Sequence, residues 1–327
     1  MNDTAQHDSP LHDTAQHDAL VIGGGPAGLQ ATLSLARVHR TVLHLDSGVY
    51  RNAPERHLHN LIGHDGQDPA ELRAAARRDI AAYGTVTSVA ARVVSLTGEA
   101  DDFTAVLDDG STRRARHVVL ATGVRDELPP IEGLTELWGR GVAHCPFCHG
   151  HELSGGAAGV IGTVPGHLLH LAGFFPRISR TFDVFSHGTA VDAETRAVLD
   201  AYGATVHDQV VERVTPQGEG LVVHLAAADP VRLDGVFVAP TVHQAAPFAE
   251  QLGLEVSAMG SILVDAFART SVPGVYAAGD AAHHRDLPMA MASVANAIGA
   301  GALAGGVCVA DLMVADRAAL LAPTAGR

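Results

Sequence analysis

Short apolar runs alternate with longer amphipathic stretches along the first third of the chain. The apolar runs have the length of single strands, and glycine-rich or acidic turn residues follow them. One amphipathic stretch opens with Asp68-Pro69-Ala70-Glu71, which combines an N-cap, a proline at the first helical position and an acid in the first turn. This alternation predicts an α/β unit. Its predicted strands cover residues 19–22, 41–45, 103–107 and 116–120, one predicted helix ends near residue 38, and the other spans about 68–83.

A second alternating segment follows the break at Pro129-Pro130 and ends at another break, near 240–247. The chain then returns to an apolar run at 275–278 and a long uncharged stretch. We therefore expect a discontinuous first domain, 19–126 and 243–327, interrupted by a smaller second domain, 127–242. The second domain's predicted strands are 159–162, 181–185, 205–206, 221–225 and 236–239, and its predicted helices are 168–174 and 192–202.

Composition narrows the class of protein. Of 327 residues, 47% are apolar and only 18% are charged, a balance that suits closely packed helices and sheets. The net charge of −14 argues against nucleic acid or an anionic membrane as a partner. The uncharged segment 287–310 is long enough to cross a bilayer, but its many Ala and Gly residues favour a buried helix.

Cysteine content and the N-terminal segment add two expectations. Only three cysteines occur, Cys145, Cys148 and Cys308, and no secretory signal is visible, which indicates the cytoplasm. Cys308 lies in a Gly/Ala-rich stretch and is most simply a small buried apolar residue. The sequence Asp-Thr-Ala-Gln-His-Asp occurs at 3–8 and again at 13–18, and so polar a segment predicts a disordered tail over 1–18.

The turn after the first predicted strand carries the spacing G-x-G-x-x-G at Gly23, Gly25 and Gly28. Between a strand and a helix, these glycines allow a tight turn, close approach of a pyrophosphate and close helix–strand packing. The helix N-terminus then stabilises the phosphate charge. Asp46, at the end of the next strand, is placed to accept hydrogen bonds from ribose hydroxyls. The pattern predicts a dinucleotide site.

A motif near the end of the chain indicates that the bound dinucleotide is FAD rather than NAD. The segment 270–280, which ends in Gly279-Asp280, resembles the second FAD motif of two-dinucleotide-binding flavoproteins. Ala121-Thr122-Gly123 resembles another short motif of the same proteins. The resemblance implies FAD as the cofactor, with Asp280 at its ribityl or phosphate portion. It also implies a helix beginning near Pro288 whose N-terminus points at the flavin.

Cys145 and Cys148 are separated by two residues at the start of a predicted helix. Amide dipoles at a helix start stabilise a thiolate on the first cysteine. Zinc is an alternative, but these cysteines, His149 and His151 fall within seven residues, too few to surround one ion. With flavin motifs on both sides, the chain resembles the low-molecular-weight thioredoxin reductase family over nearly its whole length. The resemblance implies two Rossmann-like dinucleotide-binding domains, a homodimer, and a pair in which Cys148 faces the flavin and Cys145 exchanges with substrate.

The second domain departs from that family at its NADPH site. The expected G-x-G-x-x-[GA] is replaced at 162–167 by Gly-Thr-Val-Pro-Gly-His. Val164 stands at the second glycine position, where a branched side chain blocks the approach of a pyrophosphate. After the strand 181–185 no Arg or Lys follows until Arg196. We expect an impaired nicotinamide site, and whether any NAD(P)H binding survives stays open.

Without NADPH, a dithiol is the remaining electron source and O₂ the remaining acceptor. The run Cys-Pro-Phe-Cys-His-Gly at 145–150 and the stretch 50–65 resemble the FAD-dependent dithiol oxidases of the gliotoxin, holomycin and romidepsin pathways. The hypothesis is oxidation of a small-molecule dithiol to an intramolecular disulfide, with O₂ reoxidising the flavin to give H₂O₂. The alternatives are an enzyme that reduces a protein disulfide with electrons from NAD(P)H or ferredoxin, and a non-enzymatic flavin-binding redox sensor.

These motifs and resemblances give a set of predicted site residues and no metal ligand. The predicted catalytic residues are Cys145, Cys148, His144, His149 and His64, the histidines as proton carriers. The predicted cofactor-binding residues are Gly23, Gly25, Pro26, Ala27, Gly28, Asp46, Ser47, Arg51, Asn52, His59, Asn60, Ala121, Thr122, Gly123, Gly279, Asp280, Met289 and Ala290.

Overall fold

The computed structural model describes residues 16–322, and its contacts divide them into two compact units. The first unit contains residues 16–51, 70–125 and 243–322, and the second contains 52–69 and 126–242. The sequence placed 52–69 in the first domain. The structure places this segment in the second unit, because its side chains pair with the segment that carries Cys145 and Cys148.

A mixed sheet of seven strands forms the core of the first unit. Its strands are β1 (Gln16–Ile22), β2 (Val42–Asp46), β3 (Val86–Ala90), β4 (Val93–Glu99), β5 (Asp102–Leu107), β6 (Thr112–Leu120) and β18 (Val275–Ala277). The order β3–β2–β1–β6 is parallel. The last four residues of β1 and the first four of β2 are all buried, as strands covered on both faces must be. β5 pairs antiparallel with the start of β6, and β18 pairs parallel with its end.

The first strand begins earlier than the sequence predicts. Gln16, His17 and Asp18 belong to β1, so the predicted tail over 1–18 is too long at its C-terminal end. Asp18 is held there because its carboxylate accepts hydrogen bonds from the backbone and the hydroxyl of Thr41. The rest of the predicted tail lies outside the described residues.

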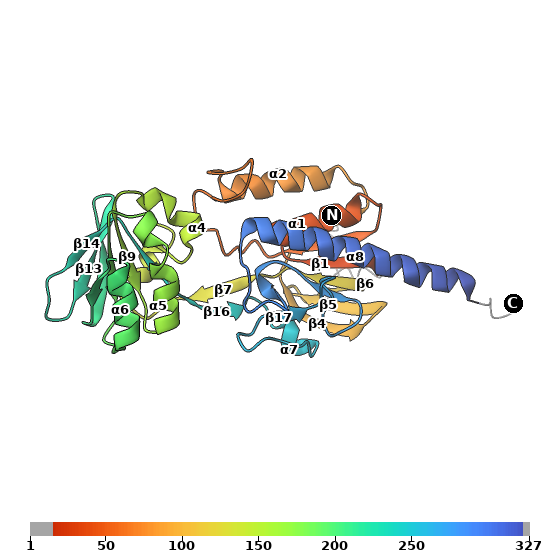
Figure 1. Ribbon diagram of the computed structural model, residues 1–327. Coiled ribbons are helices and arrows are strands. Elements are labelled where there is room, and N and C mark those ends of the chain that lie inside the picture. The colour runs from red at the N-terminus through yellow and green to blue at the C-terminus, as the bar shows by residue number, and fades with distance from the viewer. Residues whose placement is uncertain (1–15, 323–327) are drawn as a thin grey trace, which may run out of the picture. The chain divides into compact units, whose positions relative to one another are not determined.

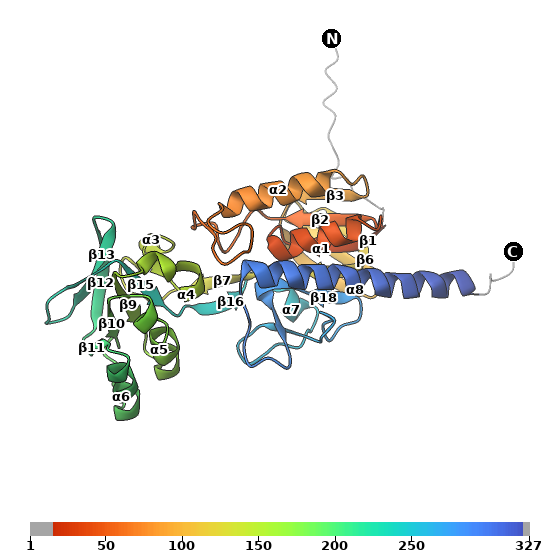
Figure 2. The same cartoon turned by 45° about the horizontal axis from the view of Figure 1, so that its top comes forward.

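Two helices of the first unit, α1 (Pro26–Ala36) and α8 (Val294–Leu321), lie side by side, as Figures 1 and 2 show. A Cβ at Gly301 would lie 2.2 Å from the Ala27 carbonyl oxygen, and one at Gly305 would lie 2.8 Å from that of Ala31. Glycines at these positions therefore allow the close approach. The unit also contains α2 (Pro69–Ala81), α7 (Phe248–Gln251), the 3₁₀ turn η3 (Gly279–Ala281), and the paired strands β17 (Ile262–Val264) and β19 (Ala282–His284).

Helix α8 differs from its prediction in its start and in its burial. It begins at Val294 rather than near Pro288, because the Ser293 hydroxyl accepts from the Asn296 N–H and caps the helix there. Among the described helices, α8 alone is long and apolar enough to cross a membrane by length and composition. The prediction of a buried helix holds for one face only, since 33% of its most apolar window is buried, and Met313 and Val314 are exposed.

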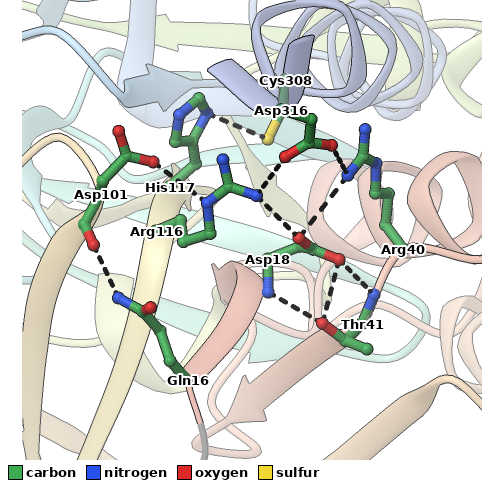
Figure 3. Close-up of polar contacts among 9 residues, drawn as sticks. All are labelled: Gln16, Asp18, Arg40, Thr41, Asp101, Arg116, His117, Cys308 and Asp316. Carbon is green, nitrogen blue, oxygen red and sulfur yellow. Dashed lines mark hydrogen bonds and ion pairs between the residues drawn. The ribbon is translucent and has the colours of Figure 1, made fainter. Parts of the chain in front are cut away.

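Ion pairs fix the C-terminal half of α8 to the sheet (Figure 3). Asp316 accepts from Arg40 at 2.6 Å and from Arg116 of β6 at 2.7 Å. Arg116 also pairs with Asp18 of β1 at 3.2 Å. The side chains are only partly exposed, so these pairs are screened less than ordinary surface pairs. They connect α8 with two neighbouring strands.

Cys308 lies deeper in the same contact between α8 and the sheet. Its side chain is fully buried, which confirms the prediction of a small buried residue. The Cys308 sulfur lies 3.8 Å from Nδ1 of His117, whose ring also contacts the Tyr276 hydroxyl at 3.2 Å. Burial raises the pKa of the Cys308 thiol far above its ordinary value. This cysteine is therefore a poor nucleophile.

The second unit has its own parallel sheet, in the order β11–β10–β9–β15–β8, beside a small antiparallel sheet. The parallel strands are β8 (Val142–Ala143), β9 (Ala157–Ile161), β10 (Thr181–Phe185), β11 (Thr205–His207) and β15 (Gly235–Val238), and the antiparallel strands are β12 (Val211–Gln217), β13 (Gly220–Leu225) and β14 (Val231–Leu233). The helices are α3 (Leu134–Leu137), α4 (Pro146–His149), α5 (Pro165–Ala172) and α6 (Ala193–Ala201), with 3₁₀ turns η1 (His151–Leu153) and η2 (Phe175–Arg177). Where the chain passes between the units, β7 (Val124–Glu127) pairs with β16 (Thr241–Gln244). The predicted α/β class is confirmed.

We predict that Gly301→Ala destabilises the first unit and that Gly306→Ala, the matched control, does not. The added methyl group at 301 meets the Ala27 carbonyl, and overpacking of this kind costs about 1–3 kcal/mol. At the exposed Gly306 nothing lies within 4 Å of the added carbon. Alanine there favours the helix by roughly 0.5–1 kcal/mol. Urea unfolding measures both changes, and equal stabilities would show that α1 and α8 are not in close contact.

Candidate active site

The two predicted redox cysteines lie at the start of a short helix in the second unit. Cys145 is the N-cap of α4, Pro146 occupies its first position, and Cys148 lies within it. The Cys148 thiol donates to the Cys145 sulfur across 2.7 Å, and neither cysteine is in a disulfide. The turn therefore brings the two sulfur atoms together as a dithiol.

The Cys145 thiol is more acidic than an ordinary cysteine. The hydrogen bond from Cys148 lowers its pKa most, and burial opposes that effect. The backbone N–H groups of Cys148 and Phe147 and the charge of His149 lower it further, to about 6. At neutral pH Cys145 is then a thiolate, the form that attacks disulfides and leaves from them. The role of Cys145 in exchange with substrate stays a prediction.

His149 is the histidine whose charge lowers the pKa of Cys145. Its backbone N–H donates to the Cys145 carbonyl at 3.1 Å, and its ring Nε2 lies 2.9 Å from a carboxylate oxygen of Glu55. Burial lowers the pKa of His149, but the hydrogen bond and charge of Glu55, the Cys145 thiolate and Glu152 together raise it. An imidazole of raised pKa beside a thiol can take up the thiol proton, and the imidazolium that forms stabilises the thiolate.

The other two predicted histidines have different surroundings. His144, directly before Cys145, stacks on Trp138 with ring centroids 5.5 Å apart. His64 is exposed, and its Nδ1 lies 2.8 Å from Gln67 of the same loop. Of the three candidates, His149 has both a backbone hydrogen bond to Cys145 and an effect on the pKa of that cysteine.

The glycine turn of the first unit leaves room for a phosphate group. A Cβ at Gly23, where φ is +124°, would lie 2.1 Å from the Ala121 carbonyl oxygen, and one at Gly28 would lie 1.8 Å from that of Gly23. The protein's own packing therefore requires both glycines. At Gly25, the N-cap of α1, nothing lies within 4 Å of an added Cβ. The open space lies beside a helix N-terminus, as a pyrophosphate requires.

Asp46 ends β2 beside this turn, and a Cβ at Gly24 would overlap its carboxylate. One carboxylate oxygen accepts from the Gly48 N–H, and the other accepts from Tyr50 and Arg77. Burial raises the pKa of Asp46, but these hydrogen bonds and the charge of Arg77 lower it more. The ionised carboxylate keeps acceptor capacity for a ribose hydroxyl. It borders a cavity of about 420 Å³.

The C-terminal motif is held against the same helix. Gly279 has φ +74°, and its Cβ would lie 2.9 Å from that of Ala27 in α1. The neighbouring Asp280 pairs with Arg51 at 2.8 Å. The predicted residues Gly23, Gly25, Pro26, Ala27, Gly28, Asp46, Ser47, Arg51, Ala121, Thr122, Gly123, Gly279, Asp280, Met289 and Ala290 all belong to the first unit, whereas Asn52, His59 and Asn60 belong to the second.

The turn after β9 has a different geometry from the first glycine turn. Val164 is the half-exposed N-cap of α5, and Pro165 at the first helical position removes one N–H donor. After β10, Nδ1 of His187 accepts from the Val211 N–H at 3.1 Å. Farther along, Arg196 is paired with Asp208 at 2.7 Å.

A family model described as pyridine nucleotide-disulphide oxidoreductase matches residues 17–301. The chain belongs to this family. The family is flavin-dependent, and the low-molecular-weight thioredoxin reductase fold with two Rossmann-like domains is confirmed. The resemblance stated from the sequence is therefore confirmed at the level of the family.

Two curated relatives and one solved structure are similar over most of their lengths. Thioredoxin reductase sirT of Leptosphaeria maculans is 35% identical, over 81% of this chain and 86% of its own. Thioredoxin reductase tcpT of Claviceps purpurea is 33% identical, over 90% of this chain and 94% of its own. HlmI, known from a crystal structure, is 35% identical in sequence to this chain. The two structures align with a TM-score of 0.83, over 97% of this chain and 100% of HlmI.

Three residues of these sites were not predicted from the sequence: Glu55, Tyr50 and Arg77. Tyr50 follows Asp46 by four residues, and Arg77 lies on the predicted helix 68–83, so both were within recognisable segments. Only tertiary packing brings Arg77 to Asp46. For Glu55 the sequence carried a weak signal, its place in the stretch 50–65 that resembles the dithiol oxidases.

We predict that Cys148→Ala raises the pKa of Cys145 from about 6 toward the ordinary thiol value, because its largest stabilising contact is lost. Alkylation by iodoacetamide at mildly acidic pH should slow by about tenfold or more, since only the thiolate reacts. Mass spectrometry of the Cys145 peptide measures the rate against pH. The buried Cys308→Ala variant serves as the control. A profile that Cys148→Ala leaves unchanged would refute the role of the sulfur–sulfur contact.

Proposed function

We propose that this protein binds FAD in its first unit and uses Cys145 and Cys148 to oxidise a small-molecule dithiol to an intramolecular disulfide. The observation that carries the proposal is the turn after β9, where Val164 and Pro165 stand in place of a nucleotide-binding glycine turn. A branched side chain and a missing donor at this point oppose the binding of a pyrophosphate. A thiol substrate then replaces NAD(P)H as the source of electrons.

The residues of the first unit fit FAD. The open space at Gly25 would take the pyrophosphate beside the N-terminus of α1, and Asp46 would accept from the ribose. Asp280 would lie at the ribityl or phosphate portion, as in the resembling flavoproteins. When bound, FAD would accept two electrons from the cysteine pair and pass them to O₂, which yields H₂O₂.

The thiol steps follow from the acidity of Cys145. A substrate thiolate attacks the Cys145 sulfur of the oxidised pair, the Cys145–Cys148 bond breaks, and Cys148 leaves as a thiolate. The second substrate thiolate attacks the substrate sulfur of the mixed disulfide, which releases the product and Cys145. A pKa of about 6 makes Cys145 a good leaving group. His149 accepts the two thiol protons in turn and passes them to solvent.

A second candidate function is reduction of a protein disulfide with electrons from NAD(P)H or ferredoxin. The names of the relatives sirT and tcpT, both of which are called thioredoxin reductase, favour it. The altered turn after β9 and the pairing of Arg196 with Asp208 favour the oxidase. A cytoplasmic location, which either function suits, stays a prediction from the cysteine content.

Anaerobic mixing of the flavin-loaded protein with dithiothreitol or with NADPH distinguishes the two functions. We expect the dithiol to bleach the visible flavin absorbance, and air to restore it with formation of H₂O₂. Micromolar NADPH should leave the flavin oxidised. Cys148→Ala is the matched control and should retain flavin that the dithiol no longer bleaches. Rapid bleaching by NADPH would establish the reductase instead, and the absence of steady turnover would indicate a redox sensor.

We also propose that the protein is a homodimer, with the exposed face of α8 covered by a second copy. Leu303, Met313 and Val314 are exposed along this helix, and Val38 is exposed just after α1. Apolar residues on one face favour association. Light scattering of the parent protein should give twice the mass of one chain. The double variant Met313→Asp/Val314→Asp should give a lower mass. A monomeric parent protein would contradict this proposal.

A further inference from the structure

The loop 52–69 contacts the cysteine-bearing segment through two pairs of histidine and carboxylate. Glu55 lies 2.9 Å from Nε2 of His149, and His59 lies 3.4 Å from Glu152. We propose that Glu55 is a positioning residue of the thiol centre, which orients the His149 ring so that Nδ1 receives the thiol proton. The proposal rests on the proposed function and deepens it, because it names Glu55 as the residue that orients the catalytic base, His149.

The hydrogen bond determines which ring nitrogen is the base. A carboxylate only accepts, so Nε2 of His149 carries the proton and donates to Glu55. The Glu55 and His149 side chains are 20% and 26% exposed, so water screens the pair less than a surface ion pair. Nδ1 is buried and has no hydrogen-bond partner among the described residues. In the neutral ring Nδ1 is the acceptor, and a thiol proton that moves to it leaves an imidazolium paired with Glu55.

The loop holds Glu55 in place through its own packing. Leu58 and Leu61 are buried, and the Leu58 N–H donates to the Gln67 carbonyl at 2.8 Å, which closes the loop. At Gly139, where φ is +75°, an added Cβ would lie 3.1 Å from a Glu55 carboxylate oxygen. A larger residue there would crowd the carboxylate. Glu55 is therefore on an ordered segment rather than at a free loop end.

Charged groups on three elements raise the pKa of His149. They are Glu55 from the loop, the Cys145 thiolate at the start of α4, and Glu152 in η1. Glu152 acts only through its charge and is itself paired with His59, whereas Glu55 also makes a hydrogen bond. Removal of the Glu55 charge therefore lowers the pKa of His149. The loss of imidazolium in turn raises the pKa of Cys145.

The test is the pH dependence of Cys145 alkylation in the reduced protein, compared between the parent and Glu55→Gln. Glutamine keeps the size of the side chain and removes the charge. We expect alkylation near pH 6 to slow by roughly three- to tenfold, because less Cys145 is thiolate. The pH optimum of dithiol oxidation should move upward in parallel. Asp229→Asn, an equal change of charge at an exposed position of the same unit, should leave both profiles unchanged, and flavin content monitors folding.

A double-mutant cycle separates positioning from a general effect on stability. His149→Gln should slow alkylation about as much as Glu55→Gln, and the double variant should show no further loss. Full additivity, or a Glu55→Gln profile equal to the parent's, would overturn the proposal. Alkylation needs neither FAD turnover nor a dithiol substrate. Bleaching by NADPH would therefore refute the oxidase while leaving this role of Glu55 intact.

Discussion

The close approach of α1 and α8 is the constraint on which the first unit depends. Gly301 and Gly305 let α8 reach the backbone of α1, and Gly279 brings η3 onto the same helix at Ala27. Segments from opposite ends of the chain thereby meet at one helix N-terminus. The ion pairs of Asp316 hold the far end of α8, so the helix is fixed both by shape and by charge. The glycine turn that is predicted to bind the dinucleotide takes its shape from this packing.

The chemistry of the thiol pair is set within the second unit. Cys148, the helix start and His149, all of this unit, together make Cys145 acidic. The parallel sheet of the second unit keeps the order expected of a nucleotide-binding domain, although the turn after β9 is altered. Buried strands depend on the apolar core rather than on a ligand, so the frame persists when the turn changes.

Local patterns allowed much of this architecture to be predicted. The strand 181–185 coincides with β10, and the glycine turn, Asp46 and the cysteine helix lie where the sequence placed them. The failures have tertiary causes. The start of α8 is decided by the Ser293 cap, the membership of 52–69 by pairing across distant segments, and the contact of Arg77 with Asp46 by packing of α2. None of these contacts leaves a periodic signal in the sequence.

The loop 52–69 belongs to the second unit, and it brings Glu55 into the same unit as the reactive cysteines. Cys145, Cys148, His149 and Glu55 all lie on one side of the division of the chain. A displacement of this unit as a whole would carry the nucleophile together with its proton acceptor and counter-charge. The contacts that prepare the thiol for reaction are therefore internal to one unit.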